Sequence, residues 1–193
     1  IKLKEDKKTL QKNKNNIFFI WPVLMILLVI ISMANVLTEG SVDTWGGLYM
    51  KDFINVVGFQ IGIATISFNI FMVLGRIYGD YFRDKLGVYR LLLILIFLTI
   101  ISLVILTLMS TILSSILGFA LLGLGSSAIV PMCYSLASNI RGVNSGVGIT
   151  IISIAVYGTF VAAPAGLGIV ANSYGINNIF TAILIIFIFL LIP

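Results

Sequence analysis

The stretch GRIYGDYFRDKLGVYR, residues 75–90, decides the fold class because it stands between two long apolar runs. It holds six of the nineteen charged side chains, in a chain that is only 10% charged and 60% hydrophobic. The mean hydropathy is +1.15. Such a composition is typical of a lipid bilayer, where about 20 apolar residues form one helix across a hydrocarbon core of roughly 30 Å. We therefore expect an all-α membrane protein, with residues 75–90 between two of its helices.

The apolar runs on either side of this stretch predict six transmembrane helices. We place them at about 17–38, 58–79, 91–109, 112–138, 145–170 and 177–193. Residues 1–16 carry six lysines and few apolar side chains, which is typical of a solvated linker. The end of the first helix is open, because residues 39–49 fit either a helical extension or a loop. The chain starts at Ile1 and stops inside an apolar run, so we expect a piece of a longer protein.

The basic side chains predict the orientation of these helices. With six spans, eleven of the twelve Lys and Arg residues fall on one side, and only Lys51 falls on the other. Loops on the cytoplasmic side carry an excess of Lys and Arg, so both ends and residues 75–90 are expected in the cytoplasm. The same asymmetry accounts for the net charge of +5, and we expect no nucleic-acid partner.

The missing residue types exclude several classes of site. Histidine is absent and Cys133 is the only cysteine, which excludes a Ser-His protease, a Cys/His zinc site, ordinary haem ligation and an intrachain disulfide. We predict no catalytic residue, no metal site and no cofactor other than a coupling proton or cation. A membrane-embedded enzyme is therefore poorly supported, and Cys133 is most simply a small buried residue.

The charged stretch has two interpretations. Its charged residues are Arg76, Asp80, Arg83, Asp84, Lys85 and Arg90. A helix would align positions 76, 80 and 84 on one face, and the remaining basic groups would then reach carboxylates or carbonyl ends of neighbouring helices. The alternative is a solvated loop whose charges serve only orientation.

The stretch also resembles a known motif. Asp84-Lys85-Leu86-Gly87 followed by Arg90 looks like the D-R-x-G-x-x-R core of a loop motif of the major facilitator superfamily, with Lys85 in place of arginine. Asp80 stands where the commoner motif has glycine. Residues 39–49, 123–131 and 158–168 are similar to parts of helices seven, ten and eleven of that family.

The resemblance covers nearly all of residues 17–193 and implies the C-terminal half of a transporter, helices seven to twelve. It is nearest to sugar-permease-like members of the bacterial inner membrane. The expected partners are the lipid bilayer, a missing N-terminal six-helix half and a small-molecule substrate moved by alternating access. Residues 76–90, with Gly87, would form a cytoplasmic gate loop. Alternatives are a non-transporting sensor or binding protein with the same fold, and a half-size transporter that dimerises.

A faint internal repeat fits two inverted three-helix units. Gly58 and Gly87 recur as Gly146 and Gly175 at the same offset of 88 residues. Inverted repeats are common in transporters, while chance placement of glycines in membrane helices is the alternative.

Glu39 and Asp43 are the most informative candidate site residues. If the first helix continues past residue 38, their spacing of four stacks two carboxylates and favours a proton or cation site; otherwise they are loop acids. Trp45 and Tyr49 are either interfacial aromatics or a platform for substrate stacking. The other polar candidates for the substrate pathway are Asn35, Gln60, Asn69, Tyr134 and Tyr157. Each of these could instead make one interhelical hydrogen bond.

Small residues and prolines complete the prediction. Glycines 118, 123 and 125, with serines 126 and 127, form a stripe that allows close helix packing. Pro131 and Pro164 each free a backbone carbonyl and favour a kink, which would serve helices that rock against each other.

Overall fold

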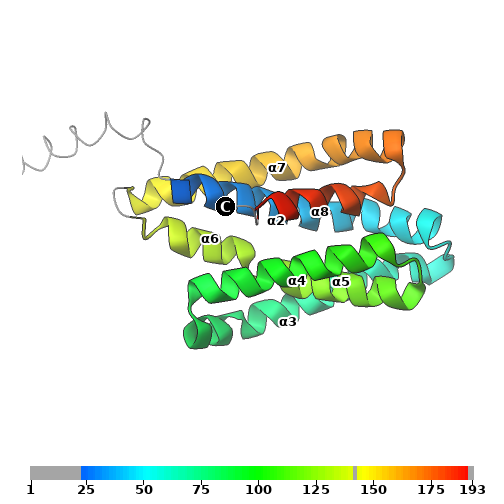
Figure 1. The fold of residues 1–193 in the computed structure, drawn as a ribbon, viewed down its shortest axis with the longest axis horizontal. Coiled ribbons are helices and arrows are strands. Elements are labelled where there is room, and N and C mark those ends of the chain that lie inside the picture. Colours follow the sequence, from blue (N-terminus) through cyan, green and yellow to red (C-terminus); the bar gives the residue numbers. More distant parts are fainter. Residues whose placement is uncertain (1–22, 141–142, 191–193) are drawn as a thin grey trace, which may run out of the picture.

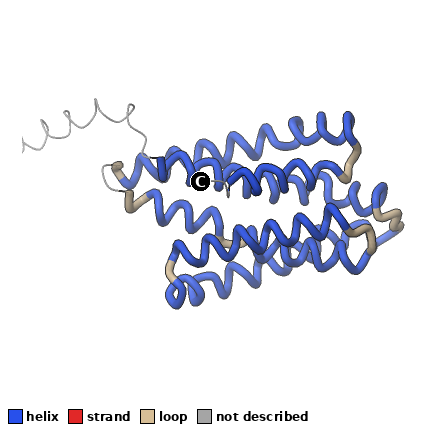
Figure 2. The backbone as a smooth tube through the Cα atoms, viewed as in Figure 1, coloured by secondary structure: helices blue, strands red, loops and turns tan. Residues whose placement is uncertain are grey.

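The computed structural model describes residues 23–140 and 143–190, and all regular structure in these ranges is helical (Figures 1 and 2). The α-helices are α2 (Val23–Leu48), α3 (Ile63–Leu86), α4 (Val88–Leu108), α5 (Ile112–Ser126), α6 (Ile129–Ala137), α7 (Ser145–Tyr174) and α8 (Asn178–Leu190). Two short helical turns, η1 (Tyr49–Phe53) and η2 (Gly58–Gly62), join α2 to α3. The linker at 1–16 and the start of the first predicted span lie outside the described residues.

Five helical stretches in the described ranges are long and apolar enough to cross a bilayer. They are Val23–Phe53, Gly58–Leu86, Val88–Leu108, Ile112–Ala137 and Ser145–Tyr174. The prediction of an all-α membrane protein is confirmed. The sixth predicted span, 177–193, contains the shorter apolar helix α8, and its last three residues lie outside the described ranges.

The first two spans extend farther than their hydropathy indicated. Helix α2 continues through residues 39–48 and Tyr49 begins η1, so the helical extension is the observed alternative. Helix α3 runs through most of the charged stretch and ends only at Leu86. Gly87 then takes φ 80°, a left-handed value that suits glycine at a helix end, and its N–H donates to the Arg83 carbonyl at 2.8 Å. The connection to α4 is this single residue.

The predicted helix 112–138 is interrupted in its middle. Helix α5 ends at Ser126 and α6 begins at Ile129, with Ala128 at φ −124° and ψ 5°. Pro131 explains the position of the break, because proline has no N–H to bond the carbonyl four residues earlier, that of Ser127. Pro164 lies inside α7, which stays helical on both sides of it.

The helices form two groups that share a core. Figure 1 shows α3, α4 and α5 together in one group and α2, α7 and α8 in the other, while α6 carries the chain from α5 to the side of α2 and α7. Tyr49 is fully buried between the groups. Its hydroxyl donates to the Leu106 carbonyl at 2.7 Å, and its ring meets those of Phe119 and Phe180 edge to face.

The small-residue stripe of α5 lets neighbouring backbones approach closely, as predicted. A Cβ at Gly123 would overlap the Phe68 carbonyl oxygen of α3, and one at Gly125 would lie 2.8 Å from the Thr99 nitrogen of α4. Cys133 is completely buried, in agreement with its interpretation as a small packing residue.

Candidate functional site

The break between α5 and α6 brings polar groups from α2 and α3 to one place inside an apolar bundle. The last carbonyls of a helix have no intrahelical donor, and here two side chains supply donors. The Asn35 amide donates from Nδ2 to the Ser126 oxygen at 3.3 Å. Arg76 Nε donates to the Ser127 oxygen at 3.4 Å. The end of α5 is therefore bound by one side chain from each of two neighbouring helices.

Glycine at position 75 permits the second of these contacts. A Cβ there would overlap the Ser127 side chain, so the α3 backbone approaches the break more closely than a larger residue would allow. The same close approach puts the Arg76 side chain within reach of a carbonyl. Gly75 and Arg76 therefore contact the break between α5 and α6, and they take no part in the ion pairs farther along α3.

Glu39 joins this cluster through Asn35. Asn35 Nδ2 donates to Glu39 Oε1 at 2.8 Å, one helical turn along α2. Asn35 is fully buried and Glu39 partly so. Arg76 and Asp43 are the charged groups within electrostatic reach of Glu39. In the described part of the chain, ion pairs are formed by Arg83 alone, so Arg76 and Glu39 are not in direct contact.

Two oxygens of the cluster have no hydrogen-bond partner among the described residues. They are Asn35 Oδ1 and Ser126 Oγ, and both residues are almost completely buried. A buried acceptor without a donor costs about 1–3 kcal/mol, so native proteins usually satisfy such atoms with a ligand or an ordered water. We refer to Asn35, Glu39 and Ser126 as the break cluster.

The other predicted pathway residues of α2 lie toward its end. Asp43 is exposed, one turn beyond Glu39. The ring of Trp45 lies against Gly168 of α7, and its Nε1 is buried without a partner in the described ranges. These two residues share the helix of the break cluster but make no hydrogen bond with it.

The remaining predicted pathway residues are spread over the bundle. Tyr134 of α6 hydrogen-bonds through its hydroxyl to Ser153 of α7 at 3.2 Å. Asn69 is exposed and donates to the Thr65 carbonyl of its own helix. Gln60 lies half-buried in η2, and Tyr157 is exposed on α7. No hydrogen bond among the described residues connects any of them to the break cluster.

The predicted gate residues at the end of α3 form a separate charged group. Arg83 pairs with Asp80 at 2.8 Å and with Asp84 at 3.1 Å. Lys85 Nζ lies 5.9 Å from the centre of the Tyr81 ring. These side chains are mostly exposed, as is Arg90, and exposed pairs of this kind typically contribute less than about 1 kcal/mol.

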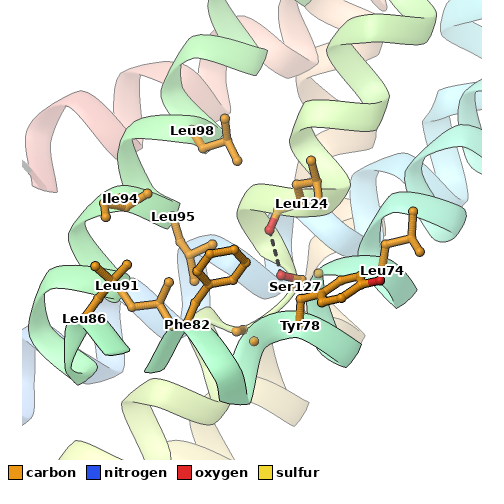
Figure 3. A pocket seen from close by; sticks show the side chains of 13 residues that line it. Leu74, Tyr78, Phe82, Leu86, Leu91, Ile94, Leu95, Leu98, Leu124 and Ser127 are labelled. Atoms are coloured by element: carbon orange, nitrogen blue, oxygen red, sulfur yellow. Dashed lines mark hydrogen bonds between the residues drawn. The ribbon is translucent and has the colours of Figure 1, made fainter. Parts of the chain in front are cut away.

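Two apolar cavities lie in the described bundle, and the first of them adjoins the break. The first, of about 400 Å³, lies between α3, α4 and α5 and is lined by Tyr78, Phe82 and several leucines (Figure 3). Ser127 reaches its wall, but the hydroxyl donates back to the Leu124 carbonyl at 2.7 Å. The second, of about 580 Å³, lies between α2, α7 and α8. Neither cavity has a charged side chain in its wall.

Sequence reasoning did not predict the carbonyls of Ser126 and Ser127 as functional groups. Both residues were interpreted only as small packing residues. The usable signal was Pro131, whose missing N–H must leave the Ser127 carbonyl without its helical donor.

Comparison with known proteins points to transport. No family model matches the chain. It is 29% identical over 155 residues to the membrane protein MosC of Rhizobium meliloti, and 29% identical over 136 residues to an uncharacterized MFS-type transporter of Yersinia pestis. It is 24% identical over 149 residues to an uncharacterized transporter of Sinorhizobium fredii (strain NBRC 101917 / NGR234).

The chain is a transporter-like membrane protein. The three matches cover 80%, 70% and 77% of it, respectively. They cover only 38%, 35% and 40% of the relatives, so the chain spans about two fifths of their length. The likeness therefore extends over most of this transporter-like chain but over less than half of each relative.

Proposed function

We propose that this chain is the C-terminal half of a secondary transporter of the major facilitator superfamily, and that the whole protein moves a small solute by alternating access. Two findings support the proposal: the relatives named as transporters, and the matched length of only about two fifths of each. The motif at residues 84–90 adds the resemblance to sugar-permease-like bacterial members. In this proposal the membrane is the bacterial inner membrane, and both ends of the chain are cytoplasmic.

The observation that carries the proposal is the break cluster inside a membrane-spanning bundle. Non-helical backbone at membrane depth is tolerated only where protein buries it or where it lines a water-filled cavity. Ionisable side chains in such spans are costly and usually mark a substrate or ion pathway. In transporters, interrupted helices place their free backbone groups at the binding site. The carbonyls at the end of α5 are backbone groups of an interrupted helix, Glu39 is the ionisable side chain, and Asn35 connects the two.

The Arg83 ion pairs would act as a cytoplasmic latch in this mechanism. They hold residues 80–84 together on the last turns of α3, next to the one-residue connection at Gly87. Charge-assisted contacts at the rim can form in one conformation and break in the other as the halves rock.

The experiment asks whether the break is reached from both sides of the membrane. In the full-length protein, with Cys133→Ala as background, we would place a cysteine at Glu39 or at Asp43 and apply a membrane-impermeant thiol reagent to right-side-out and inverted vesicles. Alternating access predicts labelling from both sides at one or both positions. Phe187→Cys, fully buried in α8, is the control that should stay unlabelled from either side.

Labelling from one side only, at both positions, would contradict alternating access. That result would favour a sensor or binding protein that keeps the fold without exchanging solute. Two reporters are needed because replacing Glu39 itself changes the cluster under test.

A further inference from the structure

The cavity between α3, α4 and α5 has the form of a long groove (Figure 3). Its lining residues run along α3 from Leu74 to Leu86 and along α4 from Leu91 to Leu98. With a rise of roughly 1.5 Å per residue, these segments are about 18 Å and about 10 Å long. The hydrocarbon layer of one bilayer leaflet is about 15 Å thick, half of the whole core. The groove therefore has a length suited to one lipid acyl chain.

The walls of the groove are suited to hydrocarbon and not to a polar ligand. Of the described lining residues, only Tyr78 and Ser127 carry a polar side-chain atom, and the Ser127 hydroxyl donates to the Leu124 carbonyl at 2.7 Å. Gly79 leaves space in the wall, because a Cβ there would meet that of Ala128 at an ordinary 3.6 Å. An ordered water needs two to four polar partners, which a cavity of this kind does not provide.

The groove lies on a side of the bundle that the described chain leaves uncovered. Tyr78, Phe82 and Ile94 line it and are 57%, 45% and 50% exposed, respectively. They belong to α3 and α4, which lie in stretches long and apolar enough to cross a bilayer. Apolar side chains exposed on such helices are positioned to contact lipid chains.

Two basic side chains lie where the groove reaches the junction of α3 and α4. Lys85 directly precedes the lining residue Leu86, and Arg90 directly precedes Leu91. Both basic residues are exposed, and neither forms an ion pair within the described ranges. An anionic group at this end of the groove would therefore meet two available positive charges.

The neighbouring acids lie on another side of α3. Phe82 and Lys85 are three residues apart and share the face of α3 that carries the groove. Asp80 and Asp84 are each two residues from Phe82, and residues two apart on a helix do not face the same way. Arg83 pairs with both acids, at 2.8 Å and 3.1 Å. The charge at the junction end of the groove is therefore positive.

We propose that this groove binds one acyl chain of an anionic phospholipid, and that Lys85 and Arg90 bind its phosphate. Basic pockets between transmembrane helices bind anionic headgroups, and each basic side chain near such a surface contributes about fivefold in affinity. A lipid chain in the bilayer is already surrounded by hydrocarbon, so the groove adds packing contacts and the basic pair supplies headgroup selectivity.

The lipid site requires only that the helices span a membrane, and it does not depend on the proposed transport function. Its place in the cytoplasmic leaflet follows from the predicted orientation of the charged stretch.

The test is native mass spectrometry of the full-length protein in detergent, titrated with dioleoyl phosphatidylglycerol or dioleoyl phosphatidylcholine. The two lipids have the same acyl chains, and only the first has a net negative headgroup. We expect phosphatidylglycerol to bind roughly tenfold or more tightly than phosphatidylcholine. The double variant Lys85→Gln, Arg90→Gln should remove this preference. Lys51→Gln, at an exposed position far from the groove in the sequence, should keep it.

A second variant tests the groove itself. Gly79→Leu would place a side chain in the space for the acyl chain, and the lost packing contacts should weaken binding of both lipids by roughly tenfold. The matched control is Gly62→Leu, whose Cβ would meet only the end of the Ile66 side chain, at 3.9 Å. This control should bind both lipids as the unmodified protein does.

Several results would overturn the inference. Equal binding of the two lipids that no variant changes means unselective surrounding lipid. Glycerol 3-phosphate binding as tightly as phosphatidylglycerol means a surface anion site without a chain in the groove. If the variants do not fold, the unmodified protein is photolabelled with phosphatidylglycerol that carries a diazirine on its acyl chain. Adducts within residues 74–98 or 124–128 support the groove, and adducts confined to other segments contradict it.

The lipid and transport proposals can fail separately. Two-sided cysteine labelling at the break without lipid selectivity leaves transport intact and rejects the lipid site. Lipid selectivity that Gly79→Leu weakens, together with one-sided labelling, leaves only the lipid site.

Discussion

At the scale of single residues, contacts between backbones decide which substitutions this chain tolerates. Gly75, Gly123 and Gly125 all lie where a Cβ would meet atoms of a neighbouring helix. Two of them fix the positions of α3 and α4 against α5. The third brings Arg76 to the break. These glycines therefore allow both the close packing of the helices and the contact of Arg76 with the candidate site.

Gly123→Ala should destabilise the protein. The added Cβ would overlap the Phe68 carbonyl oxygen, a backbone atom that cannot rotate away, so α3 and α5 must separate. Overpacking of this kind typically costs 1–3 kcal/mol, which reversible unfolding in mixed micelles would measure as a free-energy loss of about that size. Gly40→Ala is the matched control, because its Cβ would meet Ala163 at an ordinary 3.9 Å. Equal losses in both variants would contradict the explanation.

At the scale of elements, the interruption between α5 and α6 determines the candidate site. A continuous helix would bond the Ser126 carbonyl to the N–H of residue 130, whereas the Ser127 carbonyl lies opposite Pro131, which has no N–H. The interruption instead makes them available to Asn35 and Arg76. A proline does not always interrupt a helix, since Pro164 lies within α7 without ending it.

Pro131→Ala should make α5 and α6 one helix. The new N–H can bond the Ser127 carbonyl, which then no longer needs Arg76. Spin labels at Ile112→Cys and Ser138→Cys in the full-length protein, with Cys133→Ala as background, should show a narrower and longer distance distribution by pulsed electron paramagnetic resonance. Pro164→Ala, with labels at Ser145→Cys and Tyr174→Cys, should change much less because α7 is already continuous. The same change in both helices would argue against a special role of Pro131.

At the scale of the whole molecule, two helix groups pack around one aromatic centre. Tyr49 connects them, since it contacts Phe119 of α5 and Phe180 of α8 and bonds the Leu106 carbonyl of α4. Residues of α7 are largely uncovered within this chain, and the relatives are more than twice as long as the region they share with it. In the proposed transporter, this uncovered face of α7 would meet lipid or the N-terminal half.

The basic side chains predict an orientation for the whole molecule. The predicted spans put eleven of the twelve on the cytoplasmic side, so a cysteine at Asp84 should react with an impermeant reagent from the cytoplasm only. A cysteine at Asn55, between η1 and η2, should react from the opposite side only. The full-length protein with Cys133→Ala serves for both, and the parent with no added cysteine is the control. The reverse pattern would refute the orientation.

Much of the fold could be predicted from the sequence because it depends on local properties. Apolar runs of the length of a bilayer predicted the helices, and the charged stretch marked the junction of α3 and α4. Residues 39–49 could not be assigned, because Glu39, Asp43 and three glycines weaken the apolar signal. The structure shows that packing keeps them helical.

The sequence by itself determined that this is an all-α membrane protein with a charged junction near Gly87, because hydropathy and glycine act within a few residues. Only the tertiary structure decided that the Asn35 amide donates to the carbonyl of Ser126, a residue 91 positions away. It also decided that the Arg76 side chain donates to the Ser127 carbonyl and forms no ion pair with the acids of the charged stretch. The burial of Tyr49 against Phe119 and Phe180 is likewise a result of the tertiary structure. Such contacts depend on how each helix is rotated and how closely its neighbours approach, and the pattern of residues along one helix does not specify that.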